Sequence, residues 1–158
     1  TRLDHNTMPP AAKTVGNYVN SSLAKVEALK AGYDEAIMLN PQGFVSECTG
    51  ENIFVVRNGV ILTPPLSAGA LEGITQNCVA QIAAELGYEM RVENIVRSDL
   101  YIAEEIFCCG TAAEVSAINS VDDREVPCPG PITTAIAGLY AKAVRGQVVH
   151  YKHWCELA

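Results

Sequence analysis

Basic residues are few in this sequence. Eleven lysines and arginines stand against 18 aspartates and glutamates, which gives a formal net charge of −7 at pH 7. A chain with this excess of negative charge does not attract nucleic acid or an anionic membrane. Long apolar runs are also missing, because none reaches the ~18 residues that a membrane-spanning helix needs, and no signal peptide opens the sequence. These absences predict a cytoplasmic protein with no nucleic-acid or membrane partner.

The cysteines and histidines lack the spacing of a metal site. Cysteines stand at positions 48, 78, 108, 109, 128 and 155, no two of them form a CxxC pair, and most lie far from the three histidines. Zinc sites usually need such pairs, so we predict no metal centre. Cys108 and Cys109 are neighbours in an apolar stretch, where strand alternation places them on opposite faces. Free, buried thiols fit a reducing cytoplasm.

The length suffices for one domain. A chain of 158 residues buries a single core more readily than two. Apolar residues make up 49% of it and charged residues 18%, which is typical of a globular protein. The sequence begins at Thr1-Arg2-Leu3 without an initiator methionine, so we expect a piece of a longer protein.

Helices and short strands are mixed along the chain. Apolar residues recur at helical spacing over 18–31, 75–86 and 132–144, and a glycine follows each stretch within two residues. Apolar runs predict strands over 36–39, 44–46, 53–57, 60–62, 88–96, 106–109 and 115–121. Asn58-Gly59 is a strong signal for a hairpin turn. Because helices and strands do not alternate strictly, we predict an α+β fold rather than a doubly wound parallel sheet.

Two segments contain charged residues that suggest catalysis. Lys13 follows two alanines, and an amine in apolar surroundings can have a depressed pKa and form a Schiff base. Glu47 and Glu51 lie in a turn between two strands, where a carboxylate can pair with a cationic ring nitrogen. Each feature alone has a simpler explanation, which is a surface lysine or a pair of solvated acids.

Two further segments suit an anion. Leu71-Glu72-Gly73-Ile74-Thr75 leads into a helix, whose free first N–H groups form either an anion site or an ordinary cap. Gly110-Thr111-Ala112-Ala113 follows a strand, where small residues let the backbone approach a ligand or simply form a tight turn. An amine, an acid for a ring nitrogen and two anion sites are together the parts that hold pyridoxal phosphate. We therefore predict this cofactor.

The same residues carry a resemblance to a known family. In order and spacing, five motifs across residues 2–154 resemble the branched-chain amino acid aminotransferases, which are pyridoxal-phosphate enzymes of fold type IV. The motifs are Asn6–Lys13 with Gly16-Asn17-Tyr18, Ser46–Phe54, Thr63-Pro64-Pro65, Leu71–Thr75 and Gly110–Glu114. The resemblance implies that residues 1–158 are the C-terminal cofactor-binding domain, with mixed strands in a pseudo-barrel and flanking helices.

The resemblance also implies roles for single residues. Lys13 is then the catalytic lysine, which forms the Schiff base and moves the proton of the substrate Cα. Tyr18 bonds the phenolic oxygen of the cofactor, and Glu47 pairs with its pyridine nitrogen. A protonated ring stabilises the carbanion that is left when the Cα proton leaves.

The two small-residue turns bind the anionic groups by the same resemblance. Ile74, Thr75 and Thr111 bind the cofactor phosphate, and the Thr111-Ala112 turn holds the substrate carboxylate. The implied reaction transfers the amino group of leucine, isoleucine or valine to 2-oxoglutarate. Members of the family are usually dimers or larger, so a homodimer is expected.

The sequence departs from the family pattern in two ways. Gln76 stands where the family usually has arginine, which removes a cation near the phosphate and weakens cofactor binding. The family's smaller N-terminal domain, which supplies another arginine and part of the substrate pocket, has no counterpart here. We therefore expect the chain to keep its fold and bind cofactor weakly, with an exposed apolar surface and little or no transamination.

Two alternatives stay open. One is a D-amino acid aminotransferase or an aminodeoxychorismate lyase of the same fold, although Tyr18 after Gly-Asn and the Thr63-Pro64-Pro65 segment favour the branched-chain enzymes. The other is a non-catalytic dimerisation or structural domain. Gln76 and the missing N-terminal half favour that alternative, whereas the presence of Lys13 and Glu47 together argues against it.

Overall fold

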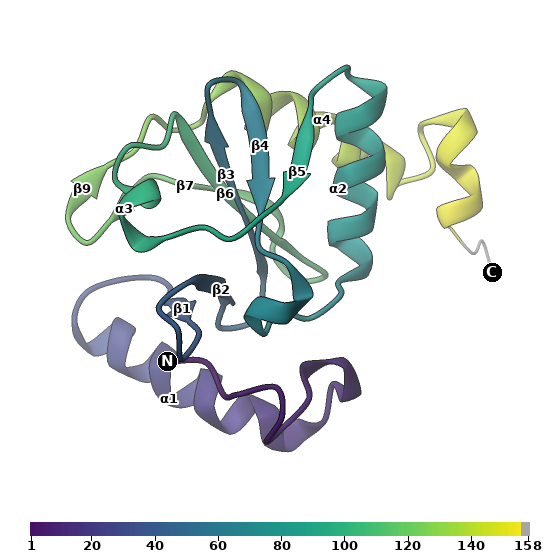
Figure 1. Ribbon diagram of the computed structural model, residues 1–158. Helices are drawn as coiled ribbons and strands as arrows, with labels where there is room; N and C mark the ends of the chain where they lie inside the picture. Colours follow the sequence, from purple (N-terminus) through teal and green to yellow (C-terminus); the bar gives the residue numbers. More distant parts are fainter. Residues whose placement is uncertain (156–158) are drawn as a thin grey trace.

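The computed structural model describes residues 1–155 and shows helices packed around short strands (Figure 1). The α-helices are α1 (Tyr18–Lys30), α2 (Ile74–Glu85), α3 (Arg97–Leu100) and α4 (Pro131–Ala143). The strands are β1 (Ile37–Leu39), β2 (Val45–Cys48), β3 (Asn52–Arg57), β4 (Val60–Thr63), β5 (Met90–Val92), β6 (Glu105–Gly110), β7 (Glu114–Ile118), β8 (Ser120–Val121) and β9 (Arg124–Glu125). The predicted α+β fold is confirmed.

The largest sheet has five strands in the order β5-β4-β3-β6-β7. Its neighbouring strands are antiparallel except β4 and β5, which are parallel. The predicted hairpin between β3 and β4 turns at Asn58 and Gly59, whose φ angles of 51° and 71° are those of the hairpin turn that Asn-Gly favours. Two smaller antiparallel sheets pair β1 with β2 and β8 with β9.

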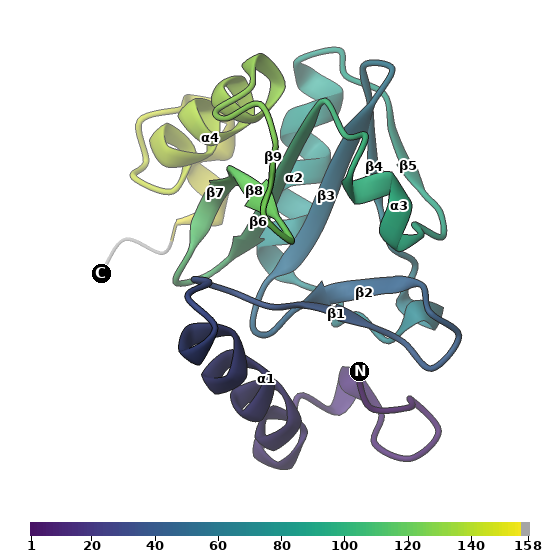
Figure 2. The same cartoon turned by 90° about the vertical axis from the view of Figure 1, so that its left-hand side faces the viewer.

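The large sheet separates two hydrophobic clusters. Phe54 and Val56 of β3 face α2 and α4, whereas Ile53 and Val55 face the opposite cluster, and all four are fully buried. Cys109 belongs to the first cluster and Cys108 to the second, so the predicted alternation of these thiols is confirmed. Residues of β2, β3, β4, β6 and β8 enclose the second cluster. This is the pseudo-barrel, with α2 and α4 on its outer side (Figure 2).

Two strand predictions were too long. The stretch 88–96 forms a strand only over Met90–Val92, an edge strand whose partner is β4. The stretch 115–121 is divided at Asn119 into β7 and β8, which belong to different sheets. The stretch 88–96 extends beyond the residues that pair with β4, whereas 115–121 changes its partner strand from β6 to β9 on either side of Asn119.

Helix α1 forms where it was predicted, but its apolar side is exposed. Val19, Leu23, Val26 and Leu29 are between 49% and 66% exposed, and only Ser21 and Ala28 of the helix are buried. Both views place α1 below the β1–β2 sheet, at the edge of the molecule (Figures 1 and 2). Within residues 1–155, the apolar stripe of α1 therefore lacks a covering element. No helix in that range is long and apolar enough to cross a bilayer.

Candidate active site

Lys13 lies at the end of a short 3₁₀ helix, Pro10–Ala12, just before α1. Its φ and ψ angles are 45° and 37°, in the left-handed region that residues other than glycine rarely adopt. Its Nζ donates a hydrogen bond of 3.1 Å to the Tyr18 hydroxyl at the start of α1. Backbone outliers of this kind cluster at functional sites, and here the outlier carries the predicted nucleophile.

Glu47 is buried, and its side chain is 7% exposed. Its Oε1 forms an ion pair of 2.5 Å with Arg2, and its Oε2 accepts a hydrogen bond of 2.9 Å from the Leu71 N–H. Burial raises the pKa of Glu47, while the Leu71 amide and the positive charges of Arg2 and Lys13 oppose that rise. The amine at position 13 is therefore within electrostatic reach of this carboxylate.

The start of α2 lies beside the same loop. Asn52 Nδ2 donates a hydrogen bond of 2.7 Å to the Leu71 carbonyl. A Cβ on Gly73, the residue that precedes α2, would overlap Asn52 Oδ1, so the loop packs tightly against β3. Ile74 and Thr75 follow as the first residues of α2, and their N–H groups have no acceptor inside the helix. Thr75 is buried and Ile74 is 85% exposed.

Gln76 closes the first turn of α2. Its Nε2 donates a hydrogen bond of 3.2 Å to Thr63 Oγ1, and its Oε1 accepts one of 3.4 Å from the Gly73 N–H. An arginine at this position would carry a charge but has no acceptor atom for the Gly73 amide. The departure from the family pattern thus replaces a cation with a helix cap.

Thr111 and Ala112 are exposed in the turn between β6 and β7. The preceding Gly110 lies against the turn that follows β2, because a Cβ there would be 3.5 Å from both Glu51 Cγ and the Gly50 carbonyl oxygen. The small-residue turn and the strand that carries Glu47 are therefore neighbours. Of the seven predicted residues, Lys13 and Tyr18 are joined by a side-chain hydrogen bond.

Sequence reasoning missed Arg2. Its side chain is only 8% exposed and bridges three separate parts of the fold. An isolated arginine near the beginning of a chain gives no sign of burial, so only the spatial neighbours reveal it. The six cysteines are free in the structure, and no cluster of metal-ligating residues occurs among residues 1–155.

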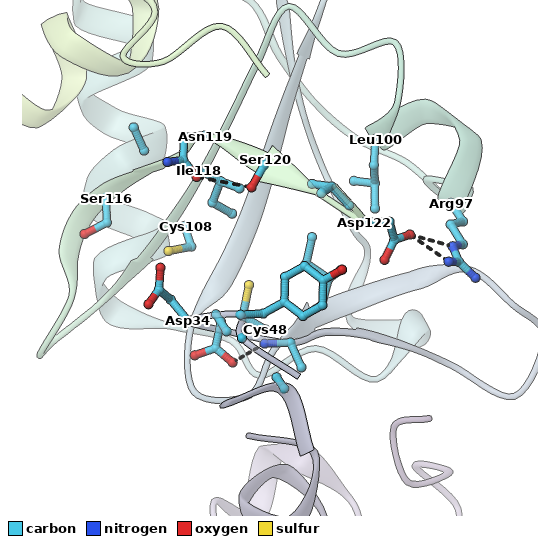
Figure 3. A pocket seen from close by; sticks show the side chains of 18 of the residues that line it. Asp34, Cys48, Arg97, Leu100, Cys108, Ser116, Ile118, Asn119, Ser120 and Asp122 are labelled. Carbon is cyan, nitrogen blue, oxygen red and sulfur yellow. Dashed lines mark hydrogen bonds and ion pairs between the residues drawn. The ribbon is translucent and has the colours of Figure 1, made fainter. Parts of the chain in front are cut away.

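A cavity of about 570 Å³ lies elsewhere in the fold, between the end of α1, β1 and the β7–β8 segment (Figure 3). Cys48 and Cys108 line its inner wall, and the ion pair of 2.7 Å between Arg97 and Asp122 lies at its edge. None of the seven predicted site residues is among the residues that line it. The predicted site residues lie outside this cavity, and Ile74 lines a second one, of about 460 Å³, at the start of α2.

The α+β fold, with an amine, a buried carboxylate and a helix start at one end of a pseudo-barrel, defines a fold-type IV domain. The family model for amino-transferase class IV matches residues 1–121. The chain belongs to this family.

Relatives and solved structures agree with this assignment. A probable branched-chain-amino-acid aminotransferase from Aquifex aeolicus is 48% identical over 97% of the chain and 50% of the relative. A branched-chain-amino-acid aminotransferase from Pseudomonas aeruginosa is 43% identical over 99% of the chain and 52% of the relative. The chain thus spans about half the length of these relatives.

Two solved structures superpose closely on the chain. The branched-chain aminotransferase from Thermoproteus uzoniensis with norvaline has a TM-score of 0.95 and 49% identity, covering 97% of this chain and 51% of that one. The T.th. branched-chain amino acid aminotransferase, complexed with N-(5'-phosphopyridoxyl)-L-glutamate, has a TM-score of 0.94 and 45% identity, covering 98% and 52%.

Proposed function

We propose that the chain is the C-terminal, cofactor-binding domain of a branched-chain-amino-acid aminotransferase and that it binds pyridoxal phosphate. The observation that supports the proposal is the Lys13–Tyr18 hydrogen bond together with the buried Glu47, on whose carboxyl the charge of Lys13 acts against the rise in pKa that burial causes. The relatives of known structure include complexes with phosphopyridoxyl glutamate and norvaline. Glutamate is the amino form of 2-oxoglutarate, so we infer that acceptor.

The donors and acceptors of the site fit this cofactor. A carboxylate has more lone pairs than the two contacts of Glu47 use, so it can also accept a bond from a protonated pyridine nitrogen. The hydroxyl of Tyr18 suits a phenolic oxygen. The free N–H groups of Ile74 and Thr75 at the start of α2 suit a phosphate.

Each residue then has one task. Lys13 Nζ would hold the cofactor covalently through its aldehyde carbon; once the substrate amine displaces it from that carbon, the freed Nζ would accept the proton from the substrate Cα and return it. Tyr18 keeps that amine in place through the hydrogen bond of 3.1 Å. Glu47 holds a proton on the ring nitrogen by its negative charge. When bound, pyridoxal phosphate supplies the electron sink for the substrate carbon.

The turn after β6 contains the two remaining residues of the predicted site. The exposed Thr111 and Ala112 offer backbone N–H groups to the substrate carboxylate, and the Thr111 hydroxyl also reaches the phosphate. Small side chains in this turn leave the backbone accessible. Leucine, isoleucine and valine are the proposed amino donors.

The proposed partners are a second domain and a second copy of the chain. The chain spans about half of its relatives, and Val19, Leu23 and Val26 expose an apolar stripe on α1. A covering domain would bury that stripe and exclude water from Lys13. We therefore expect the 158-residue chain to bind cofactor weakly, to catalyse little or no transamination, and to form dimers or larger assemblies. We also propose that the protein is located in the cytoplasm.

Borohydride reduction tests the proposal. The chain is mixed with pyridoxal phosphate, its absorbance is recorded, and the reduced protein is digested and analysed by mass spectrometry. A pyridoxyl adduct on Lys13 is expected in the wild type and in Lys30→Ala, and none is expected at that position in Lys13→Ala. Absence of the adduct in the wild type would favour a non-catalytic domain.

A substrate panel tests the branched-chain assignment. Leucine with 2-oxoglutarate should give at most slow turnover with this chain, because the covering half of the relatives' length is missing. Rapid turnover would contradict that expectation. Turnover of D-alanine but not of L-leucine would instead identify a D-amino acid aminotransferase.

A further inference from the structure

Arg2 has a buried side chain with a partner for each part of its guanidinium group. Nη2 forms the ion pair of 2.5 Å with Glu47 Oε1, Nη1 donates to Ser21 Oγ at 2.9 Å, and Nε donates to the Gly69 carbonyl at 3.2 Å. In addition, the backbone N–H of Arg2 donates a hydrogen bond of 2.7 Å to the Leu39 carbonyl. The side chains of Arg2 and Glu47 are 8% and 7% exposed.

These contacts fix the direction of the guanidinium plane. Ser21 belongs to α1 and Gly69 to the loop before α2, so the arginine connects both to β2. Gly69 has a φ angle of 93°, and a Cβ there would lie 3.4 Å from Arg2 Cγ and 3.3 Å from Ser46 Oγ. The planar fork of an arginine loses little freedom when several partners hold it. The ion pair is therefore part of a rigid arrangement.

The carboxylate of Glu47 depends on such a partner. An ionised carboxylate that is buried without compensation takes up a proton instead. The charged groups that face Glu47 are Arg2, Lys13 and the like-charged Glu51, and the Leu71 N–H is the remaining donor. Lys13 is exposed and is engaged with Tyr18, so Arg2 is the one buried cation in contact with the carboxylate among the described residues.

We propose that Arg2 is a positioning residue of the site, which keeps Glu47 ionised and directs its carboxylate toward the ring nitrogen of the cofactor. The inference rests on the proposed function for the identity of that ring. The part that concerns Arg2 and Glu47 alone can be measured without any cofactor.

An NMR titration of the cofactor-free chain tests this role. The glutamate side-chain carboxyl carbons are labelled with ¹³C, and the Glu47 signal is assigned by its loss in Glu47→Gln. Arg2→Met is expected to raise the titration midpoint of Glu47 by about 1 to 3 pH units, because an opposite charge at this distance shifts a carboxyl by that amount. Arg2→Lys keeps the charge but not the fork, and should raise the midpoint less.

The controls separate this effect from a general loss of structure. Arg57→Met removes another arginine that forms an ion pair of 2.5 Å, with Asp99, and should leave the Glu47 midpoint unchanged. If Arg2→Met does not fold, Arg2→Gln removes the charge and retains a hydrogen-bond donor. A folded, charge-removed variant with the wild-type midpoint would overturn the inference.

The borohydride experiment distinguishes this inference from the proposed function. A midpoint that moves in Arg2→Met, in a wild type that forms no Lys13 adduct, would overturn the proposed function and leave the control of Glu47 ionisation by Arg2 supported. An adduct on Lys13 together with an unmoved midpoint would support the proposed function and overturn the role of Arg2. If both the proposed function and the role of Arg2 are correct, the absorbance band of bound pyridoxal phosphate should also differ between Arg2→Met and Arg57→Met.

Discussion

Lys13 Nζ donates a hydrogen bond of 3.1 Å to the hydroxyl of Tyr18. The lysine ends a short 3₁₀ helix in a left-handed backbone conformation, and the tyrosine begins α1. A second 3₁₀ helix, Val15–Asn17, lies between the two residues, and the flexible amine meets a side chain at the start of α1. The hydroxyl limits the positions that the amine can occupy before any ligand arrives.

Tyr18→Phe should weaken the binding of pyridoxal phosphate by about fivefold, because one hydrogen bond contributes about 1 kcal/mol and about 1.4 kcal/mol is a factor of ten. The pyridoxyl adduct on Lys13 should still form at high cofactor concentration. An absorbance titration with pyridoxal phosphate measures both the affinity and the formation of the adduct. Tyr33→Phe is the control, since the Tyr33 hydroxyl bonds Asp123 and lines the separate cavity. Equal affinity of the two variants would contradict the role of Tyr18.

Gln76→Arg should strengthen phosphate binding and weaken α2. An arginine adds a charge-assisted bond of about 1.5 to 3 kcal/mol to an anion, which corresponds to at least tenfold tighter pyridoxal phosphate. The same change removes the bonds of Gln76 to Thr63 and the Gly73 N–H, so the melting temperature should fall. Asn77→Arg adds the same charge at an exposed position. If both variants bind the cofactor equally well, nonspecific charge explains the gain.

The stability of the fold should depend on the ionisation of Glu47. Burial raises its pKa above the ordinary 4.5, so the folded chain binds this proton more tightly than the unfolded chain. The resulting stabilisation is complete below the unfolded pKa and is lost as the pH rises through the folded pKa. The free energy of unfolding of the wild type, relative to Glu47→Gln, should therefore decrease as the pH rises from 4.5. Urea unfolding at several pH values measures it, and a difference that increases with pH would contradict the prediction.

Features with a local cause could be predicted from the sequence. The β3–β4 hairpin depends on Asn58 and Gly59, which adopt positive φ angles readily. Helices α1 and α2 end just before Gly32 and Gly87, whose φ angles of 91° and 78° suit a helix terminus. The start of α2, which was predicted at Thr75, lies at Ile74, directly after Gly73. These signals act over a few residues and need no tertiary partner.

Features with a distant cause could not be predicted. Arg2 is buried by residues 19 and 67 positions away in the chain, and no local pattern reports such neighbours. The apolar residues of α1 indicate a helix correctly but do not show whether anything covers them. Strand β5 is shorter than its apolar pattern because only Met90–Val92 find a partner in β4. Tertiary pairing and packing decide each of these cases.

Glycine should be required at position 130 and dispensable at position 138. A Cβ on Gly130, which precedes α4, would overlap Glu105 Cδ. The Glu105 carboxylate is buried and accepts hydrogen bonds from the N–H groups of Ile132 and Thr133, at 3.0 and 2.7 Å. It stabilises the positive end of the helix dipole, so it cannot move aside without losing these bonds.

Gly130→Ala should therefore lower the free energy of unfolding by about 1 to 3 kcal/mol, the usual cost of overpacking a buried site. Gly138 lies inside the same helix, and a Cβ added there would meet nothing within 4 Å, so Gly138→Ala should raise it by about 0.5 to 1 kcal/mol. Urea denaturation of both variants provides the comparison. Because both changes add one methyl group to α4 or its cap, effects of the same sign would show that contact with Glu105 does not determine the outcome.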